Sequence, residues 1–555
     1  MGLLKISQAI IHDPAQGING SVGDLWIKDG VMCPAPTDLT LVPDRVLDAR
    51  GLVAMAGGVD MHCHIAGPKV NLARKLRPED KRAALPVRRT TSTRSGTVGS
   101  VPSTFATGYL YAGMGYTTAI DAAIPPLSAR HALQEFQDIP ILDKGFLILL
   151  GNNHYALRQI AQGEAGRLKD FAAWILKASG AFGIKLVNPG GIENWKSGIR
   201  SMTDLDTPVA HFGCTARQII TSLAQTVMDL GLPHAAHIHC NNLGIPGNFA
   251  TTLATMQALE GRRAHFTHIQ FHSYGGHPDN QSLFCSETAR LADYFNRNKN
   301  LTTDVGQVLF GETTSMTGDG PVGYYLSKIT GRKWANSDTE MEAGCGIVPI
   351  TYKEKSFVHA LQWAIGLEWY LLVDDPWRIA MSTDHPNGAS FLAYPEIIAQ
   401  LMSKNYRDEI LARVHPKVAE KSCLRELDRE YTLNDIAIIT RAAPARMLGL
   451  AQKGHLSPGA DGDVVLYQPD HDRRRMFEFP RYVVKSGVVV VDNAEIRQTP
   501  PGQLFHVAPG HDYAALPDIR KWFDSFYTIG FDNYPVDESY FGQHSQIGCG
   551  GSLES

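Results

Sequence analysis

The 555-residue sequence lacks any long uninterrupted apolar stretch. No run approaches the roughly 18 apolar residues that a membrane-spanning helix needs. The opening MGLLKISQAI also lacks the basic start and apolar middle of a secretion signal. We therefore expect a cytoplasmic protein with no membrane association. Charged residues make up 19% and hydrophobic residues 44% of the chain, a balance that excludes a disordered protein and predicts a folded globular one.

Closely spaced cysteines are also missing. The eight cysteines are dispersed, and no C-x-x-C spacing is present to hold an iron–sulfur cluster or a cysteine-bound zinc ion. If the protein serves a redox system, another chain must carry the electrons. Cys63 and Cys240 each adjoin a histidine, but neighbouring side chains of a strand point to opposite faces, so we predict both to be buried thiols.

The middle of the chain contains eight strand-like apolar runs, several of them followed by amphipathic segments such as TARQIITSLAQTVMDLG. This order predicts an α/β fold, a (β/α)₈ TIM-like barrel over residues 53–439. The runs are GLVAMAGGVDMH, GYTTAIDAA, KGFLILLG, FGIKLVNP, AAHIHC, HFTHIQF, NLTTDVGQVLF and WRIAMSTD.

The sequences on both sides of this region have a different residue pattern. Residues 1–52 and 440–500 contain short β-rich runs separated by Gly, Asp and Asn, which predict one discontinuous small β-sandwich domain. A chain of this length exceeds the usual size of a single core, which agrees with a large and a small domain. Residues 501–555 are a C-terminal tail for which the sequence predicts no definite structure.

Candidate metal ligands lie at or near the ends of the strand-like runs. A parallel barrel gathers the carboxyl ends of its strands at one face, so residues far apart in sequence can meet there. Neutral imidazoles and anionic oxygens would hold a divalent cation and leave one position open for water. The candidates are His62 and His64, which share one face of a strand, and His239, His268 and Asp384.

Some histidines leave a choice open. His237 and His239 share a strand face, and His239 is preferred because it lies nearer the carboxyl end. In the sixth run His268, Gln270 and His272 share a face, and the choice between the two histidines remains open. The histidines that bind no metal would support a ligand, contact the substrate or be satisfied in the core.

Lys185, between two apolar residues in FGIKLVNPGG, needs a separate explanation. An ammonium group has no lone pair and cannot bind a cation. Carbamylation by carbon dioxide would turn the amine into a carboxylate able to bridge two metals. The alternative is a lysine whose head reaches solvent or a carboxylate at the strand end.

Asp384 follows the last apolar run and precedes His385 and Pro386. Two cations about 3.5–4 Å apart would make a bridging water acidic enough to attack a carbonyl near neutral pH. Asp384 would accept the proton of that water and return it to the leaving nitrogen, so we predict it to be catalytic as well as a metal ligand.

This set of residues resembles the amidohydrolase superfamily, whose members include dihydroorotase and urease. The segments LLKISQAIIHDP…DLWIKDG and GHLSPGADGDVVLY resemble the two halves of its small β-sandwich domain. The resemblance implies two divalent metal ions, with zinc expected. It assigns their ligands to His62, His64, carboxylated Lys185, His239, His268 and Asp384.

A closer similarity, to the family of formylmethanofuran dehydrogenase A subunits, covers nearly the full length. It rests on RRTTSTRSGTVGSVPSTFATGYLYAGMGYTTAIDAA, KLVNPGGIENW, HIHCNNLG, HFTHIQFHSYGG and STDHPNG. The bacterial counterpart of that family is the alpha subunit of the formyltransferase/hydrolase complex of methylotrophs. The resemblance implies metal-dependent hydrolysis of the N-formyl amide of formylmethanofuran, or its bacterial analogue, to formate and free amine, beside formyltransferase-type partner subunits. The alternatives are a dehydrogenase A subunit coupled to a redox subunit, a cyclic-amide hydrolase and an inactive scaffold subunit.

Residues 69–94 concentrate positive charge in a chain whose net charge is −4. They carry nine Lys and Arg residues, opposed only by Glu79 and Asp80. Such a segment would attract an anionic ligand such as the glutamate-bearing tail expected of the carrier, and we predict Arg88, Arg89 and His272 as substrate contacts. The alternative is a solvated or subunit-contacting loop. Nucleic acid is not an expected partner, because the segment has no aromatic residue for base stacking.

A second insertion, at residues 311–346, is rich in Gly and Thr and includes paired tyrosines. Long insertions in compact domains are usually functional. We expect it either to cover the site as a lid or to contact another subunit.

Overall fold

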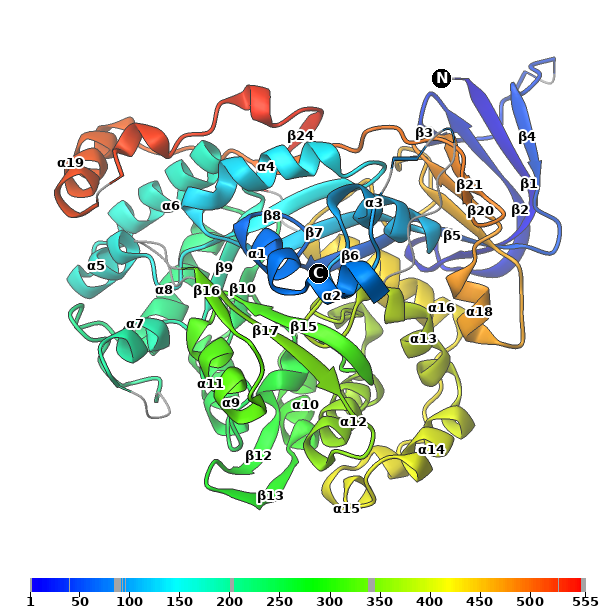
Figure 1. Ribbon diagram of the computed structural model, residues 1–555. Helices are drawn as coiled ribbons and strands as arrows, with labels where there is room; N and C mark the ends of the chain where they lie inside the picture. The colour runs from blue at the N-terminus through cyan, green and yellow to red at the C-terminus, as the bar shows by residue number, and fades with distance from the viewer. Residues whose placement is uncertain are drawn as a thin grey trace.

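The computed structural model describes residues 2–38, 40–83, 91, 93–94, 96–199, 204–337, 345–527 and 529–550. A barrel and a separate mixed sheet organise these residues (Figure 1). Within the described ranges, no helix combines the length and apolar character needed to cross a membrane.

The barrel contains eight parallel strands in sequence order, each paired with the next. Its first and last strands meet where the backbone N–H of His64 donates to the carbonyl of His385 at 2.8 Å. This arrangement confirms the predicted (β/α)₈ fold. The strands are β6 (Gly58–Cys63), β7 (Tyr116–Ile124), β8 (Asp143–Leu149), β9 (Gly183–Val187), β10 (Ala236–His239), β11 (Ala264–Phe266), β14 (Leu301–Asp304) and β18 (Ile379–Ala380).

Helices cover the outside of the barrel and bury one apolar face each. Helix α8 (Ala216–Asp229) begins at a capping box, in which the Thr215 hydroxyl accepts from the backbone of Gln218 and the Gln218 side chain accepts from the backbone of Thr215. The other helices around the barrel include α3 (Thr104–Gly113), α4 (Ala129–Asp138), α5 (His154–Gln162), α6 (Ala165–Ser179), α9 (Phe249–Ala258), α10 (Thr288–Arg297), α12 (Phe357–Leu372), α13 (Tyr394–Met402) and α17 (Ala443–Leu448).

The smaller sheet has nine strands, contributed by both flanks of the barrel, and its own hydrophobic core. In Figure 1 its N-terminal strands are blue and its C-terminal strands orange. They are β1 (Leu3–Asp13), β2 (Ile18–Lys28), β3 (Val31–Cys33), β4 (Arg45–Asp48), β5 (Val53–Ala56), β19 (Val464–Tyr467), β20 (Tyr482–Lys485), β21 (Val488–Asp492) and β22 (Glu495–Ile496). The predicted run GLVAMAGGVDMH is therefore two strands, because β5 pairs with β19 in this sheet and β6 begins the barrel.

The insertion after β14 is ordered over its described residues. It forms an antiparallel sheet of β15 (Gly311–Thr317), β16 (Ala335–Ser337) and β17 (Cys345–Tyr352), with helix α11 (Gly320–Thr330). The first insertion is the segment between β6 and β7, which includes the positively charged residues 69–94. Its helix α1 (Pro68–Leu76) packs on this sheet through a cluster of Val70, Ala73, Val101, Met316 and Ile347. The two insertions therefore support each other.

The C-terminal tail also has a defined structure. Strand β23 (Leu504–Val507) pairs in parallel with the start of β8 and with β24 (His544–Ile547). Between these strands lies helix α19 (Leu516–Phe526), and Phe531 stacks on Trp174 of α6 with 4.9 Å between ring centroids. The tail is thus attached to the outside of the barrel.

Candidate active site

A cavity of about 700 Å³ lies at the carboxyl ends of the barrel strands. All six side chains that the sequence predicts as metal ligands line it: His62, His64, Lys185, His239, His268 and Asp384. They come from β6, from the middle of β9, from the end of β10 and from the residues that follow β6, β11 and β18. The barrel thus brings the complete predicted set to one place.

The first subset is His62, His64 and Asp384. Oδ1 of Asp384 lies 3.0 Å from Nε2 of His62 and 3.1 Å from Nε2 of His64. Burial alone would raise the pKa of Asp384, but the neighbouring His268 and His62 hold it well below its usual range, so the carboxylate is ionised. An anionic oxygen and two imidazole nitrogens therefore converge on one point.

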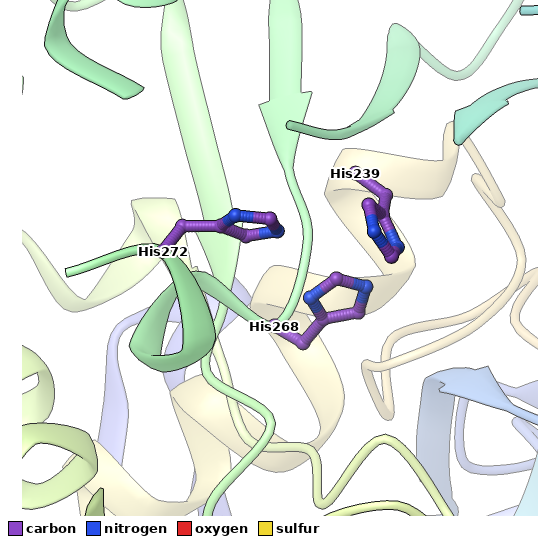
Figure 2. Close-up of side chains that lie close together, drawn as sticks. All are labelled: His239, His268 and His272. Carbon is purple, nitrogen blue, oxygen red and sulfur yellow. The ribbon is translucent and has the colours of Figure 1, made fainter. Parts of the chain in front are cut away.

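The second subset consists of His239, His268 and His272, whose rings lie close together in Figure 2. The His268 ring centroid is 4.7 Å from that of His239 and 5.3 Å from that of His272. Burial lowers the pKa of all three histidines well below the usual value, which leaves neutral imidazoles with lone pairs. His272 belongs to this subset but is not among the residues that line the cavity.

The predicted strand face shared by His268, Gln270 and His272 is wrong. Strand β11 ends at Phe266, His268 has a left-handed backbone, and the segment Ile269–His272 is a 3₁₀ helix. The apolar alternation of HFTHIQF continues past the point where the backbone leaves the sheet, so the pattern alone could not show the end of the strand.

Four non-glycine residues after barrel strands have left-handed backbones: Asn188, Asn242, His268 and Asp384, with φ of 42°, 63°, 35° and 51°. Such conformations are unfavourable by about 1–3 kcal/mol each and persist only where the surroundings fix them. Gly306, with φ of 68°, allows close approach here, because a Cβ on it would lie 2.4 Å from that of His268. The backbone of the cavity rim is therefore held in strained positions that direct side chains inward.

Several buried atoms of the site have no hydrogen-bond partner among the residues that the structure describes. They are Nε2 of His62, Nδ1 of His64, Nε2 of His239, Nδ1 of His268, both ring nitrogens of His272 and Oδ1 of Asp384. Buried polar atoms are normally paired, so this concentration requires an explanation. Imidazoles and a carboxylate are the donors that zinc and similar divalent cations prefer. The described residues therefore fit divalent metal binding.

Lys185 is fully enclosed between these groups, with 1% of its surface exposed. Burial lowers its pKa to about 7, although the carboxylates of Asp384 and Asp304 oppose the shift. A substantial fraction of the amine is therefore neutral near neutral pH, which is the form that can react with an electrophile.

Sequence reasoning missed Asp121, which supports the His62–His64 segment. Its Oδ2 accepts from the backbone N–H groups of Ile65 and Ala66, and its Oδ1 lies 3.3 Å from Nζ of Lys69 and 3.7 Å from Nδ1 of His64. An acidic residue inside the apolar run GYTTAIDAA was the available signal.

Asp304, at the end of β14, was also missed. It accepts hydrogen bonds from Nε2 of His265 at 3.0 Å, from the Ser382 hydroxyl at 2.5 Å and from the backbone N–H of His268 at 3.1 Å. Both of its oxygens are engaged, so Asp304 positions its neighbours and is not a free ligand.

Asp319 comes from the insertion and reaches the site beside His239. Its Oδ2 lies 3.4 Å from Nε2 of His239, and its Oδ1 accepts from the Asn188 amide at 3.2 Å. Burial raises the pKa of Asp319 to about 7. No local pattern could have found this residue, because its place depends on how the insertion folds over the barrel.

The positively charged first insertion is partly neutralised within the fold. Lys69 pairs with Asp121, Arg74 lies 3.1 Å from Glu135, and Arg77 lies 2.9 Å from Glu312. These three cations are thus committed to internal contacts and do not attract a ligand as the sequence suggested. The predicted substrate contacts Arg88 and Arg89 lie outside the described residues.

Comparisons with known proteins agree with this geometry. Residues 45–491 match the model of the amidohydrolase family. Protein FwdA of Methanocaldococcus jannaschii is 43% identical over 558 residues, which cover 96% of this chain and 97% of that protein. The A subunit of the formyltransferase/hydrolase complex Fhc of Methylorubrum extorquens is 37% identical over 553 residues, 98% of each chain.

Solved structures extend the comparison. A chain of the formyltransferase/hydrolase complex FhcABCD from Methylorubrum extorquens, solved with methylofuran, matches with a TM-score of 0.92 and 36% identity over 99% of this chain and 100% of that one. A D-aminoacylase matches with a TM-score of 0.50 and 12% identity over 90% of this chain and 99% of that one, a likeness of fold alone.

Proposed function

The chain belongs to the amidohydrolase family, and from that premise we propose that it hydrolyses the N-formyl amide of formylmethanofuran or its bacterial analogue to formate and free amine. It does so within a formyltransferase/hydrolase complex in one-carbon metabolism. The observation that carries the proposal is the gathering of six ligand candidates in one cavity, in a chain that matches a component of such a complex over nearly its whole length.

The metal site would consist of two subsets joined by Lys185. His62, His64 and Asp384 form the first, and the second contributes two of its three histidines, His239 and His268. Lys185 would join them as a carbamate, which forms when the amine nitrogen adds to carbon dioxide and loses a proton. Geometry supports this modification, because an unmodified ammonium at this buried position would place a cation among the ligands. A pair of divalent ions, with zinc expected, supplies acidification of water and polarisation of the formyl oxygen.

Asp384 is the proton carrier in this proposal. Its carboxylate is ionised and lies at the junction of the two imidazoles, where it accepts the proton of the attacking water. The same carboxyl then gives that proton to the amine nitrogen as the C–N bond breaks. General acid–base catalysis of this kind contributes about 10²–10⁴-fold to the rate.

The cavity extends from the metal site along the insertion, where Trp195, Tyr325, Leu326 and Ile329 form part of its wall. This length suits a carrier with a long arm better than a small cyclic amide. Arg88 and Arg89 remain the proposed substrate contacts, with formyltransferase-type chains as the proposed partners. His272, predicted with them, does not line the cavity and is not proposed to contact the substrate.

A second candidate function belongs to formylmethanofuran dehydrogenase, in which this chain would be the A subunit. This alternative is supported by the sequence identity, which is higher to the archaeal FwdA than to the bacterial Fhc protein. The hydrolytic site would be the same, and a separate redox subunit would act on the formate. Formate accumulation by the purified complex without an electron donor or acceptor supports the hydrolase complex. Formate turnover that depends on an acceptor supports the dehydrogenase.

The proposal is tested with the full chain purified together with its partner subunits. We expect stoichiometric divalent metal and formate release from the formylated carrier, with no comparable rate on a cyclic amide such as dihydroorotate. The variant Lys185→Ala should lose metal and activity together. Unchanged metal content and activity in that variant would contradict the proposal, and wild-type protein without activity or metal would indicate a scaffold role.

A further inference from the structure

Three buried histidines form a chain of hydrogen bonds that begins at the candidate ligand His62 and leads away from the cavity. Nδ1 of His62 lies 3.0 Å from Nε2 of His237, and Nδ1 of His237 lies 2.9 Å from Nε2 of His234. The chain ends where Nδ1 of His234 lies 2.8 Å from the backbone carbonyl of Met447, in helix α17. His62, His234 and His237 are each no more than 1% exposed, so these ring nitrogens are shielded from solvent and depend on protein groups for their hydrogen bonds.

The carbonyl at the end gives the chain a direction. A carbonyl only accepts, so Nδ1 of His234 must carry a proton. Burial lowers the pKa of His234 to about 3, which leaves a neutral ring whose Nε2 has a lone pair. That lone pair accepts a hydrogen bond from Nδ1 of His237, so the second ring also carries its proton on Nδ1.

The next step reaches His62. A charged His237 would place a cation between two imidazoles and near Lys185, which is unfavourable in a buried site. In its neutral form, Nε2 of His237 accepts from Nδ1 of His62. The other atoms near Nδ1 of His62 can accept as well: the Thr267 hydroxyl oxygen, and Oδ2 of Asp304 at 3.4 Å. The proton of His62 therefore lies on Nδ1.

We propose that His237 and His234 are positioning residues that fix His62 in the Nδ1–H form and so present its Nε2 lone pair to a metal ion. Nε2 of His62 faces Oδ1 of Asp384 at 3.0 Å and has no hydrogen-bond partner within the described part of the chain. This inference rests on the proposed function in one respect, the role of His62 as a ligand. It assigns a role to His237, which otherwise would be a spare histidine of the fifth barrel strand.

The chain differs from the support of the neighbouring ligand. His64 has the carboxylate of Asp121 3.7 Å from its Nδ1. His62 has the imidazole of His237 at 3.0 Å, together with the carboxylate of Asp304 at 3.4 Å. The spacing of His62, His237 and Asp304 would also admit a metal, but both oxygens of Asp304 are engaged and the two imidazoles are bonded to each other.

Substitutions at His237 test the proposal in the full chain with its partner subunits. His237→Leu removes both hydrogen bonds, and we expect the zinc dissociation constant, measured against a chromophoric chelator, to rise about 10–100-fold. His237→Gln keeps one acceptor for His62 and one donor for His234, so its affinity should remain close to wild type. The control is His12→Leu, which removes a buried histidine of the nine-stranded sheet and should leave affinity unchanged.

Equal zinc affinity in His237→Leu and wild type would overturn the proposal, and so would a His237→Gln variant as weak as His237→Leu. If His237→Leu does not fold, ¹⁵N-histidine spectra of the wild-type zinc form decide, since His234 and His237 must both carry their proton on Nδ1. A proton on Nε2 of either ring would contradict the proposed direction of these hydrogen bonds. Wild-type protein that binds no divalent metal would instead overturn the proposed function, and spectra of the metal-free protein would still test the hydrogen bonds between the histidines.

Discussion

The two ends of the barrel both bury charged and polar side chains, but they differ in whether these side chains have partners. At the amino ends of the strands, Lys453 and Lys485 contact Asp143 and Asp463. At the carboxyl ends, imidazole nitrogens and the Asp384 carboxylate converge, and several of these atoms find no hydrogen-bond partner in the described ranges. Complete pairing identifies a structural cluster that joins the barrel to the smaller sheet, whereas incomplete pairing identifies a site that requires a ligand.

Spacing alone would not separate the two ends. The carboxylates of Asp143, Asp461 and Asp463 lie as close together as a metal site requires, within 4.8 Å. Nζ of Lys453 already lies 2.7 Å from both Asp461 and Asp463, so a lysine occupies the position a cation would take. The lesson is that the partners of each buried charge must be counted before its function is inferred.

The largest effect should come from Asp384→Asn at the carboxyl end. Loss of the proton carrier is expected to lower the rate of formate release by about 10²–10⁴-fold. Steady-state kinetics of formate release measure the effect. A variant with a normal rate would contradict the assignment of Asp384.

Lys453→Met, at the amino end, should lower the stability of the fold and leave the metal site intact. It leaves Asp143 and Asp463 to share Lys485, and breaking a buried charge cluster in this way destabilises a protein by about 3–5 kcal/mol. Zinc affinity should be unchanged in the folded protein. The control is Lys5→Met, which breaks a partly exposed pair with Asp24 and should change stability by no more than about 1 kcal/mol. Equal unfolding free energies for the two variants would remove the distinction between the ends.

Asp121→Asn tests a support of the carboxyl end that binds no metal itself. Loss of the charge near Nδ1 of His64, and of the partner of Lys69, should weaken zinc binding about 10–100-fold. Chelator competition measures the effect. An unchanged dissociation constant would show that Asp121 only holds the first insertion in place.

The smallest effect concerns acid stability at the amino end. Burial alone would raise the pKa of Asp463, but Lys453 and Lys485 outweigh burial and lower it. A lowered folded pKa stabilises the protein above the unfolded pKa, about 3.9, and this stabilisation is lost as the pH falls toward the folded value. The unfolding free energy should therefore drop from about pH 5 downward, and less steeply in Asp463→Asn. Identical slopes in denaturant titrations would contradict this source of stability.

The sequence predicted the parts of the fold that depend on local pattern. The eight runs correspond to the eight barrel strands, and Cys63 and Cys240 are buried as alternation along the strands required. The predicted ligands lie together because a parallel barrel places strand ends at one face. The break between β5 and β6 was missed, because Gly57 interrupts an otherwise continuous apolar run that serves two sheets.

Parts that depend on distant packing could not be predicted. Asp319 reaches His239 only because the second insertion folds as a sheet and helix against the first, and nothing near Asp319 in sequence encodes that contact. Lys69, Arg74 and Arg77 looked like a free positive surface, yet their partners Asp121, Glu135 and Glu312 lie 52, 61 and 235 residues away. The tail likewise gains its strands by pairing with β8 and with itself.

The most direct test is an anomalous-scattering map, collected at the zinc edge, from crystals of active protein. We predict two peaks in the cavity, the first bonded to His62, His64 and Asp384 and the second to His239 and His268, with density that extends from Nζ of Lys185 between them. We predict none at Asp143, Asp461 and Asp463. A cavity without a peak in active protein, or a peak only at the amino end, would contradict the account.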